Sequence, residues 1–167
     1  MTQEELEKIL ENHRHGLNED CEGWETMRAN LRGVDLYRAD LSGADLSGAF
    51  NVPYIPMVCP EEGEFIGWKK SRDNIIIKLH IPEDAKRSSA TTRKCRCSKA
   101  RVVAFYDLKG NEITDVTETK SRHNKEFVYR LGKMAEVADF DDNRWEECCN
   151  GIHFFMQRNE AKEYDFR

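Results

Sequence analysis

The sequence predicts a mainly β protein of the α+β class, with a short helix near each end. Three observations lead to this prediction. A five-residue repeat, typical of a coil rather than a helix or a sheet, runs from Arg28 to Ala49. Short runs of β-branched and aromatic residues, separated by turn residues, fill the chain from residue 63 onward. Only two short segments, 3–15 and 159–164, are predicted to be helices.

Length and composition limit the class of protein. The 167 residues suffice for one domain, or for one domain with a small appendage. Charged residues make up 34% of the chain and the net charge is −5, so the protein as a whole is not built to bind nucleic acid. We expect no membrane span and no export, because there is no apolar run of about 18 residues and no signal peptide. Six cysteines without a secretion signal indicate reduced thiols or metal ligands, and a cytoplasmic location.

The N-terminal segment has the pattern of an amphipathic helix. Residues 2–5, Thr-Gln-Glu-Glu, have the spacing of a capping box, and apolar residues follow at helical positions: Leu6, Ile9 and Leu10. We expect a helix over residues 3–15 that ends near Gly16 and covers the open end of the repeat. His13 and His15 are expected to lie in solvent, and Trp24 to fill the interface with the repeat.

The repeat has the form A-[D/N]-L-x-x in four consecutive copies, and Ala49-Phe50 begins a fifth that fails. The small residue and the leucine lie two positions apart, so both point to the same side of an extended backbone. The pattern resembles the pentapeptide-repeat family, whose chains wind as right-handed, four-sided β-helices with one repeat per side. Four copies give about one coil, which needs a cap from this chain or from a second molecule. A homodimer through the repeat coil is therefore one expected assembly.

Some pentapeptide-repeat proteins resemble duplex DNA through stacked outward carboxylates. Here the outward carboxylates would lie on different sides of a single coil: Asp35, Asp40 and Asp45. We therefore expect no mimicry of DNA by this element.

The rest of the chain predicts a proline-containing connector followed by an antiparallel sheet. Residues 51–60 hold three prolines among apolar residues, which favours an extended segment at a surface. Strands are predicted over residues 65–68, 74–81, 100–108, 112–116, 126–131, 133–137 and 152–156, with a turn at 109–111 and the last helix at 159–164. The segments 126–131 and 133–137 are expected to pair around Gly132.

Three stretches of the second half carry a further resemblance: IPEDAKRSSATTRKCRCSKARV, DFDDNRWEECCNGIHFF and NEAKEY. They resemble a domain of unknown function that is common in phages and prophages and often follows a few pentapeptide repeats. The resemblance spans about residues 63–166 and implies no activity. We divide the chain accordingly into a capping helix and lead-in (1–27), a repeat coil (28–50), a connector (51–62) and a β-rich domain (63–167).

The densest group of cations lies between Lys86 and Arg101, a window without an acidic residue. Guanidinium and hydroxyl groups together can bind a phosphate, a nucleic-acid backbone or an acidic surface. The candidate binding residues are Lys86, Arg87, Ser88, Ser89, Arg93, Lys94 and Arg96. The alternative is a solvated basic loop that pairs with the acids of the chain itself, chiefly Asp139, Asp141, Asp142, Glu146 and Glu147.

A candidate zinc site consists of Cys95, Cys97, Cys148 and His153. On a strand Cys95 and Cys97 would share a face, and Cys148 and His153 would complete a tetrahedral Cys₃His set. The C-x-C spacing is not the usual one for zinc, and buried free thiols are the alternative. In the resembling family a small polar residue occupies the place of Cys149, which argues against a role that needs both Cys148 and Cys149.

His153 is also a candidate general base. The alternative is a histidine whose ring nitrogens are bonded to a backbone carbonyl or a nearby carboxylate. No nucleophile elbow, P-loop or H-E-x-x-H motif accompanies it.

The function expected from the sequence is non-catalytic binding. The resemblance to phage domains implies interference with a host process, such as a nuclease-based defence of the CRISPR kind, through contact with a host protein. The alternatives are a module that binds phosphate, a nucleotide or nucleic acid at residues 86–101, and a small metal- or histidine-dependent enzyme. No cofactor is expected other than zinc.

Overall fold

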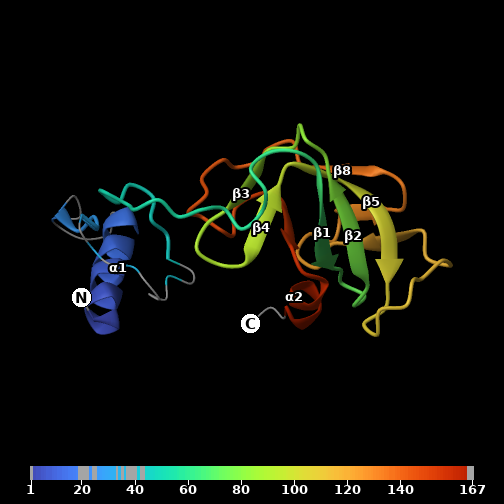
Figure 1. Cartoon of the computed structure of the whole chain (residues 1–167), viewed down its shortest axis with the longest axis horizontal. Coiled ribbons are helices and arrows are strands. Elements are labelled where there is room, and N and C mark those ends of the chain that lie inside the picture. Colours follow the sequence, from blue (N-terminus) through green and yellow to red (C-terminus); the bar gives the residue numbers. More distant parts are fainter. Residues whose placement is uncertain are drawn as a thin grey trace.

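The computed structural model describes residues 2–18, 23, 26–32, 34, 36, 41 and 44–164. Helix α1 lies at one end of the molecule and a seven-stranded sheet at the other, joined by the connector (Figure 1). The prediction of a mainly β fold with an N-terminal helix, an antiparallel sheet and a short C-terminal helix is confirmed. Trp24 and much of the repeat lie outside the described residues.

Helix α1 extends over Gln3–Asn18, past the predicted end at Gly16. The predicted capping box is present: the Thr2 Oγ1 accepts a hydrogen bond from the Glu5 N–H (3.2 Å), and the Glu5 carboxylate accepts one from the Thr2 nitrogen (2.7 Å). The apolar stripe of the helix packs on the repeat through a small core of Leu6, Ala29, Leu31 and Leu46.

The expectation that His13 lies in solvent is wrong. Its side chain is fully buried, and its Nδ1 accepts a hydrogen bond from the Ala29 N–H at 3.2 Å. An accepting Nδ1 requires a neutral ring, and burial lowers the pKa of His13. His13 therefore ties the helix to the first repeat, while His15 is exposed as expected.

The described part of the repeat shows a recurring backbone hydrogen bond and one parallel bridge between its first copy and the start of the fifth. The N–H three positions after a leucine donates to that leucine's carbonyl in three pairs: Val34 to Leu31, Ala44 to Leu41, and Ala49 to Leu46. Asn30 and Phe50 form a parallel bridge, flanked by hydrogen bonds from Leu31 N–H to Phe50 O (2.9 Å) and from Phe50 N–H to Ala29 O (2.7 Å). The bridged residues are four five-residue repeats apart.

The sheet has the order β3-β4-β9-β1-β2-β5-β8, and its paired strands are antiparallel. The strands are β1 (Phe65–Lys70), β2 (Ile76–Ile81), β3 (Arg87–Ser89), β4 (Lys94–Cys97), β5 (Lys99–Tyr106), β8 (Met134–Glu136) and β9 (Ile152–Phe155). A separate pair consists of β6 (Glu118–Lys120) and β7 (Val128–Arg130). Helix α2 (Arg158–Glu163) packs against β1 and β9.

Several predicted strands differ from those in the structure. The segment 112–116 forms no strand, because only Glu112 bridges to Tyr106 beyond the tight turn at Gly110 (φ 100°). The expected pairing of 126–131 with 133–137 is also wrong. β7 pairs with β6, and β8 adds to the edge of β5, since the turn at Gly132 directs the two strands to different partners.

The β-rich domain and the N-terminal unit are in contact. Trp145 packs against the small N-terminal core, and the Asn143 Nδ2 donates to the Ser47 Oγ at 2.7 Å. The Arg144 guanidinium donates to the carbonyl oxygens of Ile55 and Ser89, both at 3.0 Å. Residues 143–145 thus join the repeat, the connector and β3.

Candidate functional site

The basic segment of residues 86–101 forms the β3–β4 hairpin and the start of β5, and much of its charge is used internally. The Arg87 guanidinium lies 5.1 Å from the Phe65 ring and donates to five backbone carbonyls, those of Pro60, Gly63, Pro82, Glu83 and Ala85. A guanidinium satisfied in this way holds the connector and the β2–β3 turn against the sheet.

Three of the predicted binding residues are buried, which corrects their expected place on a binding surface. Ser88, Ser89 and Arg96 are 4%, 3% and 2% exposed. The Ser89 Oγ accepts a hydrogen bond from the Val58 N–H (2.8 Å). The Arg96 guanidinium donates to three carbonyls at 2.6 to 3.1 Å, those of Asp141, Asn143 and Asn150.

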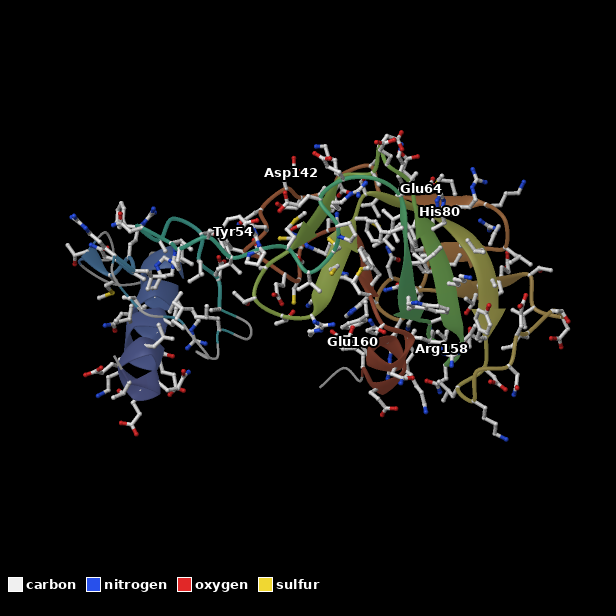
Figure 2. The ribbon with its side chains drawn as sticks, in the orientation of Figure 1. Tyr54, Glu64, His80, Asp142, Arg158 and Glu160 are labelled. Carbon is white, nitrogen blue, oxygen red and sulfur yellow. The ribbon has the colours of Figure 1, made fainter. Side chains whose placement is uncertain are left out.

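The other cations of the segment point to different places. Lys86 pairs with Asp142 (3.0 Å), and Arg93 pairs with Glu160 of α2 (2.5 Å) (Figure 2). Lys94 instead lines a cavity. The segment therefore does not present its predicted residues on one surface.

The proposed zinc ligands are not brought together. Residues directly opposite each other on paired strands share a face of the sheet, and the register of β4 on β9 places Cys95 opposite Phe154, Arg96 opposite His153, and Cys97 opposite Ile152. Both cysteines consequently point into the apolar core, whereas His153 lies on the other face. The predicted zinc site is wrong, because a strand alternates its side chains between the two faces.

The buried thiols have the properties of core residues. Burial raises the pKa of Cys97 to about 12, and a hydrogen bond with Cys59 together with burial raises the pKa of Cys95. Within the described ranges, one group of metal-ligating atoms converges: those of Asp141, Glu146 and Cys149. Burial and the two neighbouring carboxylates raise the pKa of Cys149 to about 12, so its thiol is protonated there.

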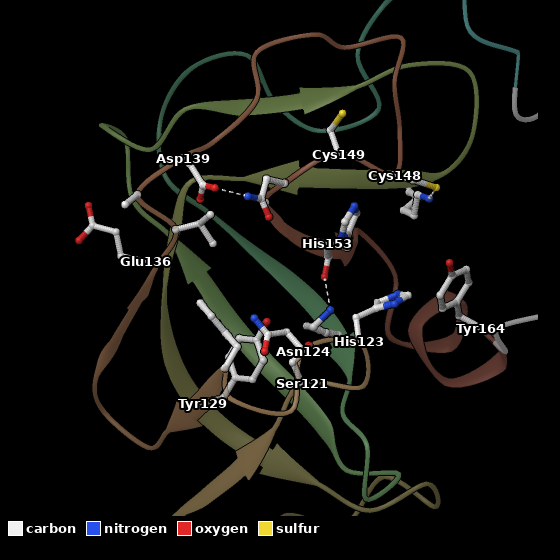
Figure 3. A pocket seen from close by; sticks show the side chains of 17 residues that line it. Ser121, His123, Asn124, Tyr129, Glu136, Asp139, Cys148, Cys149, His153 and Tyr164 are labelled. Carbon is white, nitrogen blue, oxygen red and sulfur yellow. Dashed lines mark hydrogen bonds between the residues drawn. The ribbon is translucent and has the colours of Figure 1, made fainter. Parts of the chain in front are cut away.

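A cavity of about 490 Å³ opens where β1 and β9 part, since these strands share a single register pair, Trp68 opposite Phe155. Figure 3 shows lining side chains from β7, β8, β9, the loops before β7 and β9, and Tyr164 after α2. Lys69 of β1 and Lys94 of β4 also line the cavity. Its size is within the range of small-molecule sites. The polar lining residues include Lys69, Lys94, Ser121, His123, Asn124, Tyr129, Glu136, Asp139, Cys148, Asn150 and His153.

Lys69 is the most unusual of these residues. Its side chain is 8% exposed, and its Nζ donates one hydrogen bond, to the His153 carbonyl oxygen at 3.0 Å. No carboxylate of the described residues lies within ion-pairing distance of this ammonium. Burial, with a smaller contribution from the Lys94 charge, lowers the pKa of Lys69 to about 8. The protein thus places a cation in a position that costs free energy, and no carboxylate of the described residues pairs with it.

The two histidines of the cavity are neutral at physiological pH. The His153 Nε2 lies 3.0 Å from the Glu147 carbonyl oxygen, which can only accept, so Nε2 carries the proton. Burial and the charges of Lys69 and Lys94 lower the pKa of His153 to about 3. The pKa of His123, whose ring centre lies 6.3 Å from that of His153, is lowered for the same reasons.

Lys94 and Cys148 lie at the mouth of the cavity. The Lys94 Nζ donates to the Cys148 Sγ at 3.4 Å, and both side chains also line a second hollow next to Trp145. Deeper inside, Tyr129 is buried, and its hydroxyl pKa is raised by that burial. The cavity therefore offers two ammonium groups, neutral imidazoles, a protonated phenol and the acidic side chains of Glu136 and Asp139.

Sequence reasoning found Lys94, Cys148 and His153 in this region but missed Lys69, Ser121, His123 and Tyr129 as cavity residues. One available signal was the alternation of β1, in which Lys69 occupies the same face as Gly67 and Phe65, both of which adjoin the buried ring of Phe154. A lysine at an inward position of a strand is rare unless it has a partner.

The fold and the cavity define a β-rich domain with a polar cavity that opens to the surface, joined to a pentapeptide-repeat segment. Residues 55–161 match the family model described as a family of unknown function (DUF5758), and residues 27–50 match the model of the pentapeptide repeats. The first match covers more than half of the chain, so the protein belongs to DUF5758. No curated protein and no solved structure matches the chain. No helix of the described residues is long and apolar enough to cross a membrane.

Proposed function

We propose that the protein is a non-catalytic binding protein whose cavity takes a small ligand with a phosphate or carboxylate group. The observation that carries the proposal is Lys69, a buried ammonium that lacks an anionic partner among the described residues. An ammonium has three donors, and the His153 carbonyl uses one of them. A ligand anion would accept from the others and offset the cost of burying the charge.

The groups nearest Lys69 favour an anion at this end of the cavity, while the acids Glu136 and Asp139 line another part of it. Lys94 lies on the same cavity wall, and the neutral rings of His123 and His153 add no negative charge. A nucleic-acid backbone fits less well. Arg96 is buried and the Arg87 guanidinium already donates to five backbone carbonyls, so neither is available to phosphates. The basic segment contributes Lys94 alone to this site.

The environment of His153 argues for binding over catalysis. A general base works best with a pKa near the operating pH, whereas the pKa of His153 is about 3. Its Nε2–H is held by the Glu147 carbonyl. The ring therefore serves to shape the cavity wall.

The test is calorimetric titration of the full chain with inorganic phosphate and with acetate at pH 7. We expect saturable binding of at least one anion, weakened by added salt, and its loss in Lys69→Met. Lys133→Met is the matched control, because Lys133 is exposed and lies outside the cavity. Absence of binding, or equal binding by Lys69→Met, would overturn the proposal.

For the N-terminal segment we propose the one-coil, four-sided β-helix that the repeat predicts. The parallel bridge between Asn30 and Phe50 supports it, because a separation of four five-residue repeats equals one turn of such a coil. The recurring bonds to the leucine carbonyls support a bend within each described repeat. Dimerisation through the end of the coil stays a prediction, and light scattering at high protein concentration tests it.

Contact with a host protein is the second candidate function. Two exposed aromatic side chains favour it: Phe50, 55% exposed, at the end of the repeat, and Tyr54, 82% exposed, in the connector. Figure 2 shows Tyr54 between the two units. Aromatic residues are enriched at protein interfaces. Interference with a host defence, including one of the CRISPR kind, rests on the phage resemblance. Native mass spectrometry of the purified chain should show a stoichiometric partner that Phe50→Ser/Tyr54→Ser loses.

A further inference from the structure

The charges that line the cavity differ between its two sides. Lys69 and Lys94 lie on the side of β1 and β4, near Cys148 and His153. Two acids lie on the other side: Asp139, from the loop after β8 and across the opening from Tyr164, and Glu136, the last residue of β8 (Figure 3). The Asn150 Nδ2 donates to one oxygen of the Asp139 carboxylate, which orients it and leaves its other oxygen as an acceptor.

The walls between these charges are mainly apolar. Phe127 and Tyr129 pack edge to face with ring centres 5.2 Å apart, and Val137 and Ala138 complete the surface toward Asp139. A ligand that reaches from the lysines to Asp139 would therefore meet cations at one end, apolar walls in the middle and a carboxylate at the other end. The Asn124 and Asn150 amides add neutral donors and acceptors.

We infer that the ligand of this cavity is a small zwitterion, with a phosphate or carboxylate on Lys69 and Lys94 and an ammonium group on Asp139. This inference rests on the proposed anion site and adds the second, cationic end of the ligand. A purely anionic ligand would leave the Asp139 carboxylate facing it with like charge, whereas an ammonium group converts that contact into a charge-assisted hydrogen bond.

The experiment compares four probes by calorimetry on the full chain: phosphoethanolamine, β-alanine, inorganic phosphate and ethanolamine. We expect the better zwitterion to bind about tenfold more tightly than phosphate, because a hydrogen bond between charged groups is worth roughly one order of magnitude in affinity. Whether phosphoethanolamine or β-alanine binds more tightly identifies the anionic group. Ethanolamine alone should bind weakest.

One variant and its control test whether Asp139 binds the ammonium end of the ligand. Asp139→Asn should reduce zwitterion affinity about tenfold to the level of phosphate, with phosphate affinity unchanged or raised. Asp142→Asn is the matched control, an exposed acid that pairs with Lys86 outside the cavity. Melting temperatures of both variants report whether either has lost its fold.

The outcomes distinguish the two proposals. Phosphate binding with no advantage for either zwitterion would overturn the zwitterion inference and leave the anion site in place. An equal effect of Asp139→Asn and Asp142→Asn would also overturn it, because the effect would then come from net charge. Absence of saturable binding by every probe would overturn the anion site and the inference together.

Discussion

The Lys69 Nζ lies 3.0 Å from the carbonyl oxygen of His153, across the place where β1 and β9 part. This bond joins two central strands that share only one register pair, Trp68 opposite Phe155. The lysine side chain thus substitutes for missing ladder bonds and at the same time brings a positive charge into the cavity. The buried charge lowers the stability of the fold, whereas the proposed anion binding requires that charge.

Lys69→Met should raise the free energy of unfolding while abolishing anion binding. Lowering the pKa of this lysine from 10.5 to about 8 corresponds to about 3 kcal/mol at neutral pH. Loss of the hydrogen bond to the His153 carbonyl offsets part of this stabilisation. We therefore expect the free energy of unfolding to increase by about 1 kcal/mol. Urea unfolding at pH 7 measures it. A destabilised Lys69→Met, beside an unchanged Lys133→Met, would show that the bond across β1 and β9 outweighs the buried charge.

The protein should lose stability in mild acid through its buried histidines. The folded-state pKa values of His13 and His153 are lowered, that of His153 to about 3. Below about pH 6.5 the unfolded chain therefore binds more protons than the folded chain, and stability falls as pH decreases toward 3. Each such histidine contributes up to about 1.4 kcal/mol per pH unit.

The test of this pH dependence is urea unfolding between pH 7.5 and 4.5 for the wild type, His153→Gln and His15→Gln. His15 is an exposed helix residue and serves as the control. The wild type and His15→Gln should share one slope, and His153→Gln should show a shallower one. Identical slopes for all three proteins would mean that His153 titrates in the folded state as it does in the unfolded state.

The parts of the fold that local pattern specifies could be predicted from the sequence. Thr2 and Glu5 identified the start of α1, and runs of apolar β-branched residues identified β2 and β5. The strands β3, β4 and β6 could not be predicted in this way. They are rich in charged and hydroxyl residues, and their buried polar groups bond to distant segments. Ser89 of β3 accepts from the Val58 N–H, Arg96 of β4 donates to the Asp141 carbonyl, and Thr119 of β6 donates to the Asp73 carboxylate.

The candidate site could not be predicted from local sequence patterns, because the sheet topology brings distant segments together. Lys69 and His153 are far apart in the sequence and meet because β9 inserts between β4 and β1. The same insertion sends Cys95 and Cys97 to the face opposite His153, which a spacing argument cannot detect. His13 was misplaced because its partner, the Ala29 N–H, belongs to the repeat.

Gly67→Ala should be strongly destabilising. A β-carbon at this position would lie 2.6 Å from Phe154 Cδ2 and 3.0 Å from Ile81 Cδ1, and both neighbours belong to the packed core. We expect a loss of about 2 to 3 kcal/mol, typical of overpacking. Gly63→Ala is the control, since a β-carbon there meets nothing within 4 Å and its φ of +72° alone should cost about 1 kcal/mol. Thermal unfolding of both variants decides, and equal losses would show that the core around Phe154 adjusts without cost.

Two arginines of the basic segment should respond differently to the same substitution. Arg96→Lys removes a buried fork that donates to three carbonyls and lies over the Phe140 ring, so we expect a loss of about 3 kcal/mol. Arg93→Lys keeps a charge beside Glu160 at the surface and should cost less than about 1 kcal/mol.

Urea unfolding and phosphate titration of these two variants test the role assigned to the segment. If residues 86–101 serve the fold, the stability loss is confined to Arg96→Lys, and phosphate affinity is preserved in Arg93→Lys. If instead Arg93→Lys reduces phosphate affinity about tenfold without a change in stability, the anion is bound at the hairpin surface. The anion site would then lie not in the Lys69 cavity but at the turn between β3 and β4, where Arg93 pairs with Glu160.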